Sequence, residues 1–297
     1  MNISAWVSAF RLRTLPLALA SIGMGSFLAA ADQQFQWPVL VLAAVTTIFL
    51  QVLSNLANDY GDTINGADNI SRVGPERAVQ SGVITIKAMR LAILVFALLS
   101  LASGLYLLYI SVGFSGQVFL VFLGLGLLSI VAAYSYTAGS RPYGYAGLGD
   151  VFVLLFFGFV GVLGTYFLHA GQLAPGIWLP ALATGLFAAA VLNVNNIRDI
   201  DSDRIAGKKS IPVRIGRDKA EVYHWTLLIL GMLAAGIYIS ELSFTWTRLL
   251  FLLSFPLFII NGVAIQKKRE AEALDPYLKQ LALSSFLFMI LFGLSVM

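Results

Sequence analysis

The hydrophobic positions of this chain form nine long runs that are separated by short polar segments. Each run approaches the roughly 20 residues that an α-helix needs to cross the apolar core of a bilayer. Backbone groups cannot stay unpaired in lipid, and the runs are too long and continuous for barrel strands. The pattern therefore predicts an all-α, polytopic membrane protein with nine transmembrane helices. The predicted spans are residues 15–31, 39–57, 88–110, 118–137, 151–170, 177–194, 222–240, 249–265 and 281–296.

The composition favours the same class of protein. Hydrophobic residues make up 59% of the 297 positions and charged residues 11%, whereas soluble domains have about 45–50% and about 25%. Mean hydropathy is +0.84. These values exclude a disordered chain, a DNA-binding module and a water-exposed cytosolic enzyme, so we expect no nucleic-acid partner. No soluble domain fits between the spans, which predicts one transmembrane domain over residues 1–297, with motif-bearing loops at about 55–90 and 195–219.

The basic residues predict how the chain is oriented in the membrane. All but one of the nineteen Lys and Arg residues lie before the first span or between an even-numbered span and the next odd-numbered one, and the exception is Arg248. The positive-inside rule then places these segments and the N-terminus in the cytoplasm and the C-terminus outside. The first run resembles a signal peptide, but eight further spans favour a retained first helix. We expect a multi-pass protein of the cytoplasmic (inner) membrane.

Two clusters of Asn and Asp lie at the predicted cytoplasmic ends of the second and sixth spans. In the second cluster Asn195, Asp199 and Asp203 are spaced to form one stripe along a helix. Carboxylates cost about 2.5–3.5 kcal/mol each at the membrane centre, although less near its surface, and acidic groups are disfavoured at helix C-termini. The simpler alternative is that these side chains only face water. The candidate metal ligands are Asn55, Asn58, Asp59, Asp62, Asn195, Asp199 and Asp203.

The residue types in these clusters point to one class of metal. The chain has no cysteine and two histidines, which excludes thiolate sites and leaves little room for a histidine cluster. Oxygen ligands alone suit Mg²⁺, which commonly joins a few carboxylates to the phosphates of a substrate. Basic side chains follow both clusters, and such cations suit the outer oxygens of a diphosphate. Each basic residue, taken alone, is also explained by the positive-inside rule. These candidates are Arg72, Arg77, Lys208 and Lys209.

The motifs resemble those of the UbiA-type intramembrane aromatic prenyltransferases. The resemblance covers nearly the whole chain and is closest in the branch that uses 1,4-dihydroxy-2-naphthoate. Where the superfamily patterns NDxxDxxxD and DxxDxxxD have Asp, this chain has Gly66 and Asn196, and both departures are similar to the naphthoate branch. The segments that carry the resemblance are RLRTLPL (11–17), LSNLANDYGD (53–62), RVGPERAVQSG (72–82), YSYTAGSRPYGY (134–145) and NNIRD through GK (195–208).

The resemblance implies transfer of a polyprenyl chain from polyprenyl diphosphate to 1,4-dihydroxy-2-naphthoate, with loss of CO₂ and diphosphate, to give demethylmenaquinol. Cations placed where charge develops on the leaving diphosphate lower the barrier. The lipid bilayer is a further partner because the tail is as apolar as lipid. The residues expected to act in catalysis by holding Mg²⁺ are Asp59, Asp62, Asp199 and Asp203. The residues expected near the acceptor are Arg11, Arg13, Arg141, Tyr134 and Tyr136.

Two alternative functions remain open. The first is the same reaction with a different acceptor, and the second is a different class of protein. Another aromatic acceptor, such as 4-hydroxybenzoate, is compatible with the shared carboxylates. A cation-coupled transporter is compatible with carboxylates near the membrane, because such groups often mark ion pathways. However, the spans that precede Asp59 and Asp199 run in the same direction, which predicts both motifs at one face rather than a path across the membrane.

Overall fold

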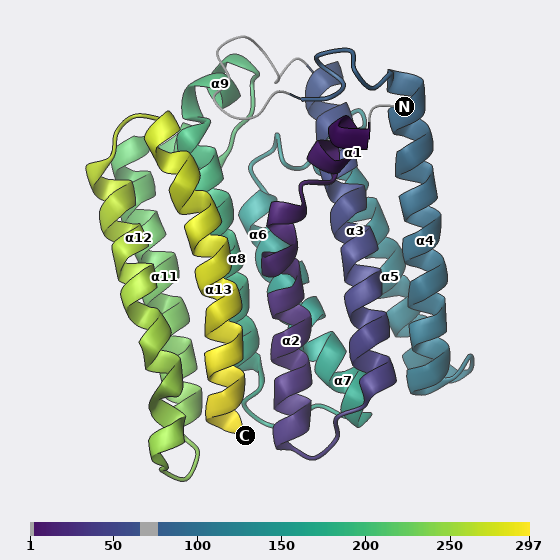
Figure 1. Ribbon diagram of the computed structural model, residues 1–297, viewed down its shortest axis with the longest axis vertical. Coiled ribbons are helices and arrows are strands. Elements are labelled where there is room, and N and C mark those ends of the chain that lie inside the picture. Colours follow the sequence, from purple (N-terminus) through teal and green to yellow (C-terminus); the bar gives the residue numbers. More distant parts are fainter. Residues whose placement is uncertain (1–2, 66–76) are drawn as a thin grey trace.

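The computed structural model describes residues 3–65 and 77–297, and this part of the chain forms helices and connecting turns without strands (Figure 1). The prediction of an all-α protein is confirmed. The helices are α1 (Ile3–Phe10), η1 (Leu12–Thr14), α2 (Leu15–Ala31), α3 (Trp37–Ile64), α4 (Ile86–Val112), α5 (Gly116–Ser135), α6 (Gly149–Val153), η2 (Leu154–Leu163), α7 (Gly164–Ala170), α8 (Trp178–Arg198), α9 (Ile200–Ile205), α10 (Ile211–Ile215), α11 (Arg217–Ser240), η3 (Trp246–Ser254), α12 (Phe255–Lys267), η4 (Glu272–Leu274) and α13 (Asp275–Val296).

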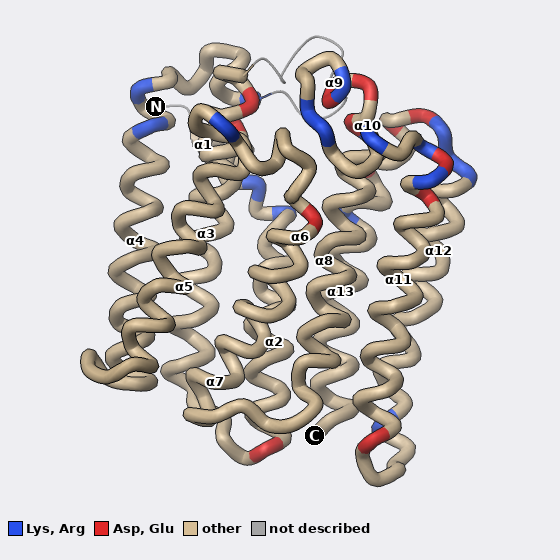
Figure 2. The backbone as a smooth tube through the Cα atoms, turned by 180° about the vertical axis from the view of Figure 1, so that it is seen from behind, with Lys and Arg blue, Asp and Glu red and all other residues tan. Residues whose placement is uncertain are grey.

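Nine helical segments of the described chain are long and apolar enough to cross a membrane, as the sequence predicts. The first begins in α1, the fifth consists of α6, η2 and α7, and the eighth joins η3 to α12. The N-terminal and C-terminal ends lie at opposite ends of the bundle (Figure 1). Most charged residues gather at the end that carries α9 and α10 (Figure 2). We refer to this end as the charged end, and its cytoplasmic location remains a prediction.

Two of the spans that extend further than predicted carry a motif. Helix α3 continues to Ile64 instead of ending near 57, and α8 continues to Arg198 instead of ending near 194. The hydrophobic runs end before the helices do because the last turns contain the polar motif residues. The first motif is therefore fully helical through Asp62, and helix geometry decides which of its side chains face inward.

Helix α8 is the most enclosed of the nine spans, and small residues allow its neighbours to approach closely. A Cβ atom at Gly185 would lie 2.9 Å from the carbonyl oxygen of Leu154 and 3.0 Å from the Cα of Gly158. Close contact through small residues is typical of helix packing in membranes, where dispersion rather than water exclusion stabilises the interface. Gly158 and Gly185 therefore set the position of the fifth span against α8.

The middle of the fifth span is a π-helix, η2. Its wider turn keeps residues that are four apart near one face, and π segments are often found at functional sites. In this span the repeated face points into the interior cavity of the protein. The residues of this face include Phe152, Phe156, Val160, Gly164 and Leu168.

Replacing Gly185 by Leu is expected to lower the melting temperature, because the new side chain would collide with Leu154. Overpacking of this kind costs about 1–3 kcal/mol. Thermal unfolding of the purified protein measures the change. Gly236→Leu in α11 is the matched control, since no atom lies within 4 Å of a Cβ there. Equal melting temperatures for both variants would contradict the close packing of η2 on α8.

Candidate active site

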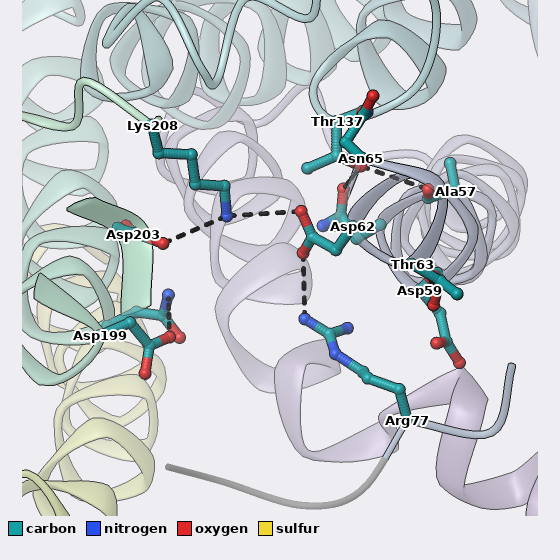
Figure 3. A network of polar contacts seen from close by, with 12 residues as sticks. Ala57, Asp59, Asp62, Thr63, Asn65, Arg77, Thr137, Asp199, Asp203 and Lys208 are labelled. Carbon is teal, nitrogen blue, oxygen red and sulfur yellow. Dashed lines mark hydrogen bonds and ion pairs between the residues drawn. The ribbon is translucent and has the colours of Figure 1, made fainter. Parts of the chain in front are cut away.

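The two motifs meet at the charged end through one lysine. The Nζ atom of Lys208 lies 3.4 Å from Asp62 Oδ1 and 3.4 Å from Asp203 Oδ1 (Figure 3). Asp62 lies near the end of α3, whereas Asp203 lies in α9 after the sixth span. Both carboxylates are buried. The structure therefore brings together side chains that are far apart in the sequence.

Further groups hold the same two carboxylates. Arg77 Nη2 donates to Asp62 Oδ2 at 3.2 Å, and the Tyr145 hydroxyl donates to Asp62 Oδ1 at 3.2 Å. The Ser210 hydroxyl donates to Asp203 Oδ2 at 3.3 Å. The Tyr145 ring also lies 5.2 Å from Lys208 Nζ, which is within the range of a cation–π contact. Tyr145 and Ser210 were not among the site residues that the sequence predicts.

The charge balance of the cluster keeps Lys208 cationic. Burial lowers the pKa of Lys208, but the nearby carboxylates of Asp62, Asp203 and Asp199 outweigh burial and raise this pKa. Burial also raises the pKa of Asp203, and Lys208 opposes that change. The lysine and its carboxylates thus stabilise one another's charged forms at a site where all three side chains are largely buried.

The second motif does not lie on one continuous helix. Helix α8 ends at Arg198, Asp199 caps it with φ −94° and ψ 14°, and α9 begins at Ile200. The Asp203 N–H still donates to the Asp199 carbonyl at 2.8 Å. The predicted stripe therefore survives a change of helix at Asp199, and its three members, with Asn196, line the cavity: Asn195, Asn196, Asp199 and Asp203.

Arg198 is a buried partner that the sequence prediction missed. Its Nε and Nη2 atoms donate to the two oxygens of Asp199 at 2.8 Å each, and Nη2 also donates to Asn195 Oδ1 at 3.0 Å. Its Nη1 atom donates to Asp275 Oδ1 at 2.6 Å. The position of Arg198 directly before the motif aspartate was a usable signal, but nothing in the sequence connects Asp275 to this cluster.

Within the first motif, three predicted ligands line the cavity and one does not. Asn55, Asn58 and Asp62 line it. Asp59 is 2% exposed and is not among the lining residues, and its carboxylate points away from Lys208 (Figure 3). The inward face of α3 is thus the one that contains Asn55, Asn58 and Asp62, and Asp59 lies beside that face.

The predicted asparagines also tie α3 to its neighbours. The Asn55 amide donates to the Phe10 carbonyl at 2.9 Å and to the Thr14 hydroxyl at 3.0 Å. Asn58 Oδ1 accepts a hydrogen bond from the Thr137 hydroxyl at 3.1 Å. Asn55 therefore has a structural use besides any role in ligand binding.

The predicted basic residues divide by position. Arg77, Lys208 and Arg11 line the cavity. Arg11 has a left-handed backbone (φ 46°, ψ 55°), which is costly for a non-glycine residue and turns α1 into α2. Lys209 is exposed and is not a lining residue, although its N–H donates to the Tyr145 carbonyl at 3.0 Å. Arg72 lies outside the described residues.

Of the remaining residues expected near the acceptor, some line the cavity and others do not. Tyr136 lines the cavity, whereas Tyr134 and Arg141 are exposed and are not lining residues. Arg13 is exposed, and its Nη1 atom lies 3.7 Å from Asp275 Oδ2. The Tyr136 ring contacts the Tyr143 ring edge-to-face, with centroids 5.3 Å apart.

The cavity has charged residues at one end and mainly apolar residues along the rest of its length. It has a volume of about 450 Å³ and extends from Asp62, Asp203 and Lys208 at the charged end to the buried side chains of Ile22 and Leu168. Its inner walls are mainly aliphatic and aromatic. A ligand with an anionic head and a long apolar tail matches this shape.

The donor atoms at the charged end fit a hard divalent cation. Among residues 3–65 and 77–297, no group of three or more His, Cys, Asp or Glu side chains is placed to hold a metal by itself. Mg²⁺ needs only one or two carboxylates when substrate phosphates complete its coordination. Asp62 and Asp203 meet that requirement, and they already share one cationic group in Lys208.

Solved structures with the same fold cover almost the whole chain. A UbiA homolog from Archaeoglobus fulgidus, bound to DMAPP and Mg²⁺, aligns with a TM-score of 0.66 at 18% identity, over 96% of this chain and 98% of that one. The apo structure of a UbiA homolog from Aeropyrum pernix K1 aligns with a TM-score of 0.69 at 17% identity, over 96% of both chains. These likenesses show the fold.

Relatives in sequence cover the chain from end to end. A protein of Haemophilus influenzae named 1,4-dihydroxy-2-naphthoate octaprenyltransferase is 43% identical over 100% of this chain and 96% of its own. A protein of Escherichia coli with the same name is 43% identical over 98% of this chain and 94% of its own. The model of the UbiA prenyltransferase family matches residues 18–290. This chain therefore belongs to the UbiA prenyltransferase family.

Proposed function

We propose that this protein transfers a polyprenyl chain from polyprenyl diphosphate to 1,4-dihydroxy-2-naphthoate, releasing CO₂ and diphosphate and giving demethylmenaquinol. The observation that carries the proposal is the carboxylate–lysine cluster of Asp62, Asp203 and Lys208 at the head of a long apolar cavity. The names of full-length relatives at 43% identity support both substrates. The structural neighbour solved with DMAPP and Mg²⁺ supports the donor class and the metal.

The residues of the cluster take separate roles toward the donor. Asp62 and Asp203 would hold Mg²⁺, which when bound neutralises the charge that develops on the diphosphate. Lys208 and Arg77 both contact Asp62 and line the cavity, which supports a role for them as donors to the diphosphate oxygens. Arg198 keeps Asp199 and Asn195 oriented at the rim of the same site.

The acceptor is expected beside the end of the prenyl tail that carries the diphosphate. Arg11 provides a cation that lines the cavity for the acceptor carboxylate, and the Tyr136 ring provides a π face near the allylic carbon. The allylic C–O bond breaks and its electrons leave with diphosphate, while the ring carbon that bears the carboxylate bonds to the tail. The C–C bond to the carboxylate then breaks, CO₂ leaves, and the electrons of that bond restore the aromatic ring.

The geometry favours this reaction over transport. The charged cluster opens at one end of the bundle, and the cavity ends among buried apolar residues such as Ile22, Leu107 and Leu168. A transport path would need polar contacts near both faces. We place the charged end in the cytoplasm and the protein in the inner membrane, because nearly all basic residues lie at that end.

The substrate assignment is tested with membranes that contain the protein, labelled octaprenyl diphosphate and one aromatic acid at a time. Label should enter the product with 1,4-dihydroxy-2-naphthoate and Mg²⁺, stop with EDTA and return when Mg²⁺ is restored. Membranes without the protein are the control. Preferred transfer to 4-hydroxybenzoate would refute the acceptor assignment, and full activity in EDTA would refute the metal.

Asp203→Asn is expected to reduce prenyl transfer by at least about 100-fold, because removing a single group that stabilises developing charge typically has an effect of this size. The matched control is Asp201→Asn in the same helix, where the side chain is 84% exposed. Initial rates in membranes, normalised to the amount of inserted protein, make the comparison. Near-normal turnover of the Asp203 variant would remove Asp203 from the metal site.

Lys208→Gln is expected to raise the Michaelis constant for the prenyl donor by about tenfold or more, since charge-assisted hydrogen bonds to diphosphate are worth about 1.5–3 kcal/mol. Lys209→Gln changes the adjacent, exposed lysine and serves as the control. Steady-state kinetics with varied donor separate the two variants. A Lys208 variant that keeps the wild-type Michaelis constant would exclude this lysine from diphosphate binding.

A further inference from the structure

The mouth of the apolar cavity lies on α5. Among the described residues that line the cavity, Gly126 and its neighbour Leu127 are exposed on the surface, and the others are buried or partly buried. Leu127 is 45% exposed, whereas lining residues on α2, α3 and α8 are buried or partly buried. No atom lies within 4 Å of the position that a Cβ would take at Gly126. The cavity therefore reaches the lipid-facing surface beside a residue without a side chain.

Aromatic contacts bound this mouth on both sides along α5. Toward the uncharged end, the Phe122 ring lies 5.3 Å from the Phe167 ring of α7. Toward the charged end, the Tyr143 hydroxyl donates to the Ala132 carbonyl at 3.0 Å, and the Tyr143 ring stacks on Phe152 at 4.0 Å. Between these contacts the face of α5 has no comparable ring contact with the fifth span among the described residues. The opening is thus confined to the stretch of α5 around Gly126.

The distance from the charged end to the mouth can be compared with a prenyl tail. Tyr136 lines a small pocket together with Asp203 and Lys208, so it marks the diphosphate site at the end of α5. Gly126 precedes Tyr136 by ten positions, which corresponds to about 15 Å along a helix. An isoprene unit adds four backbone bonds of about 1.5 Å each and extends about 4–5 Å. About three units therefore separate the diphosphate site from Gly126. A two-unit geranyl tail ends before the mouth, and longer tails pass it.

The closed part of the cavity is too short for a long tail. On α3 the lining residues extend from Asp62 to Ala43, and nineteen positions correspond to about 28 Å. About six extended units fit that length, with units of about 4–5 Å built from bonds of about 1.5 Å. The far end is closed by Ile22, Leu107 and Leu168, all buried. An eight-unit tail must therefore leave the protein before its end.

We infer that Gly126 is a specificity-determining residue for tail length: its missing side chain lets long prenyl tails leave the cavity for the bilayer beside α5. The inference rests on the proposed function, because it takes the ligand to be a prenyl diphosphate. A bulky residue at 126 discriminates against long donors and spares short ones. The chemistry at Asp203 and Lys208 is unaffected, since Gly126 lies about 15 Å along α5 from Tyr136, which lines a small pocket together with them.

The test measures donor binding without an acceptor. Gly126→Phe and wild type are purified in lipid nanodiscs with Mg²⁺ and titrated calorimetrically with octaprenyl diphosphate or geranyl diphosphate. Octaprenyl diphosphate should bind Gly126→Phe about tenfold more weakly, which corresponds to lost apolar contacts of about two methylene groups. Binding of geranyl diphosphate should stay within about twofold, because its tail ends before the mouth.

Gly124→Phe is the matched control. Gly124 lies on the same helix, has no atom within 4 Å of a Cβ, and is not a lining residue. It should bind both donors as wild type does. Equal weakening of both donors in Gly126→Phe, unchanged octaprenyl binding, or the same selectivity in Gly124→Phe would each overturn the inference.

The experiments distinguish a failure of the proposed reaction from a failure of the proposed role of Gly126. Selective loss of octaprenyl binding in Gly126→Phe, together with a wild type that does not prenylate 1,4-dihydroxy-2-naphthoate, would support the role of Gly126 and refute the acceptor. Wild-type transfer without selectivity in the variant would refute the role of Gly126 alone. A wild type that binds neither donor would refute both.

Discussion

The ammonium group of Lys208, held between Asp62 and Asp203, is the interaction on which the rest of the site depends. Two buried carboxylates, one near the end of α3 and one in α9, repel each other unless a cation lies between them. Removing one partner of a buried charge pair costs about 3–5 kcal/mol, because the remaining charge stays desolvated. The lysine therefore joins the two motif-bearing halves of the bundle, and it does so at the position where a divalent cation and its diphosphate are expected.

The same end of the molecule contains a second, separately balanced set of charges. Arg198 binds both oxygens of Asp199 and one oxygen of Asp275, so it connects the sixth span to α13. Asp199 thus begins with a fixed guanidinium partner, whereas Asp62 and Asp203 share a flexible lysine. A lysine side chain has several rotatable bonds, whereas a bidentate arginine pair is more constrained.

Several site features followed from the sequence, and several did not. The pairing of both motifs at one face followed from the direction of the spans, and Lys208 and Arg77 from their proximity to the motifs. The sequence predicted Asn55, Asn58, Asp59 and Asp62 together as ligands, and only the packing of the bundle shows that the carboxylate of Asp59 is not in the lining of the cavity. Tyr145 and Ser210 come from connecting segments, whose path does not follow from any periodicity, and Asp275 begins α13, far from the motifs in the sequence.

The sequence by itself determined the nine spans, the charge asymmetry between their ends and the oxygen-only donor set, because each depends on local composition and on the thickness of a bilayer. Only the tertiary structure decided which carboxylate Lys208 contacts, which face of α3 lines the cavity and where the cavity opens. These depend on how helices far apart in the sequence rotate and pack. Close contacts such as Gly158 against Gly185 set that packing, whereas no neighbouring atom lies within 4 Å of a Cβ built at Gly126.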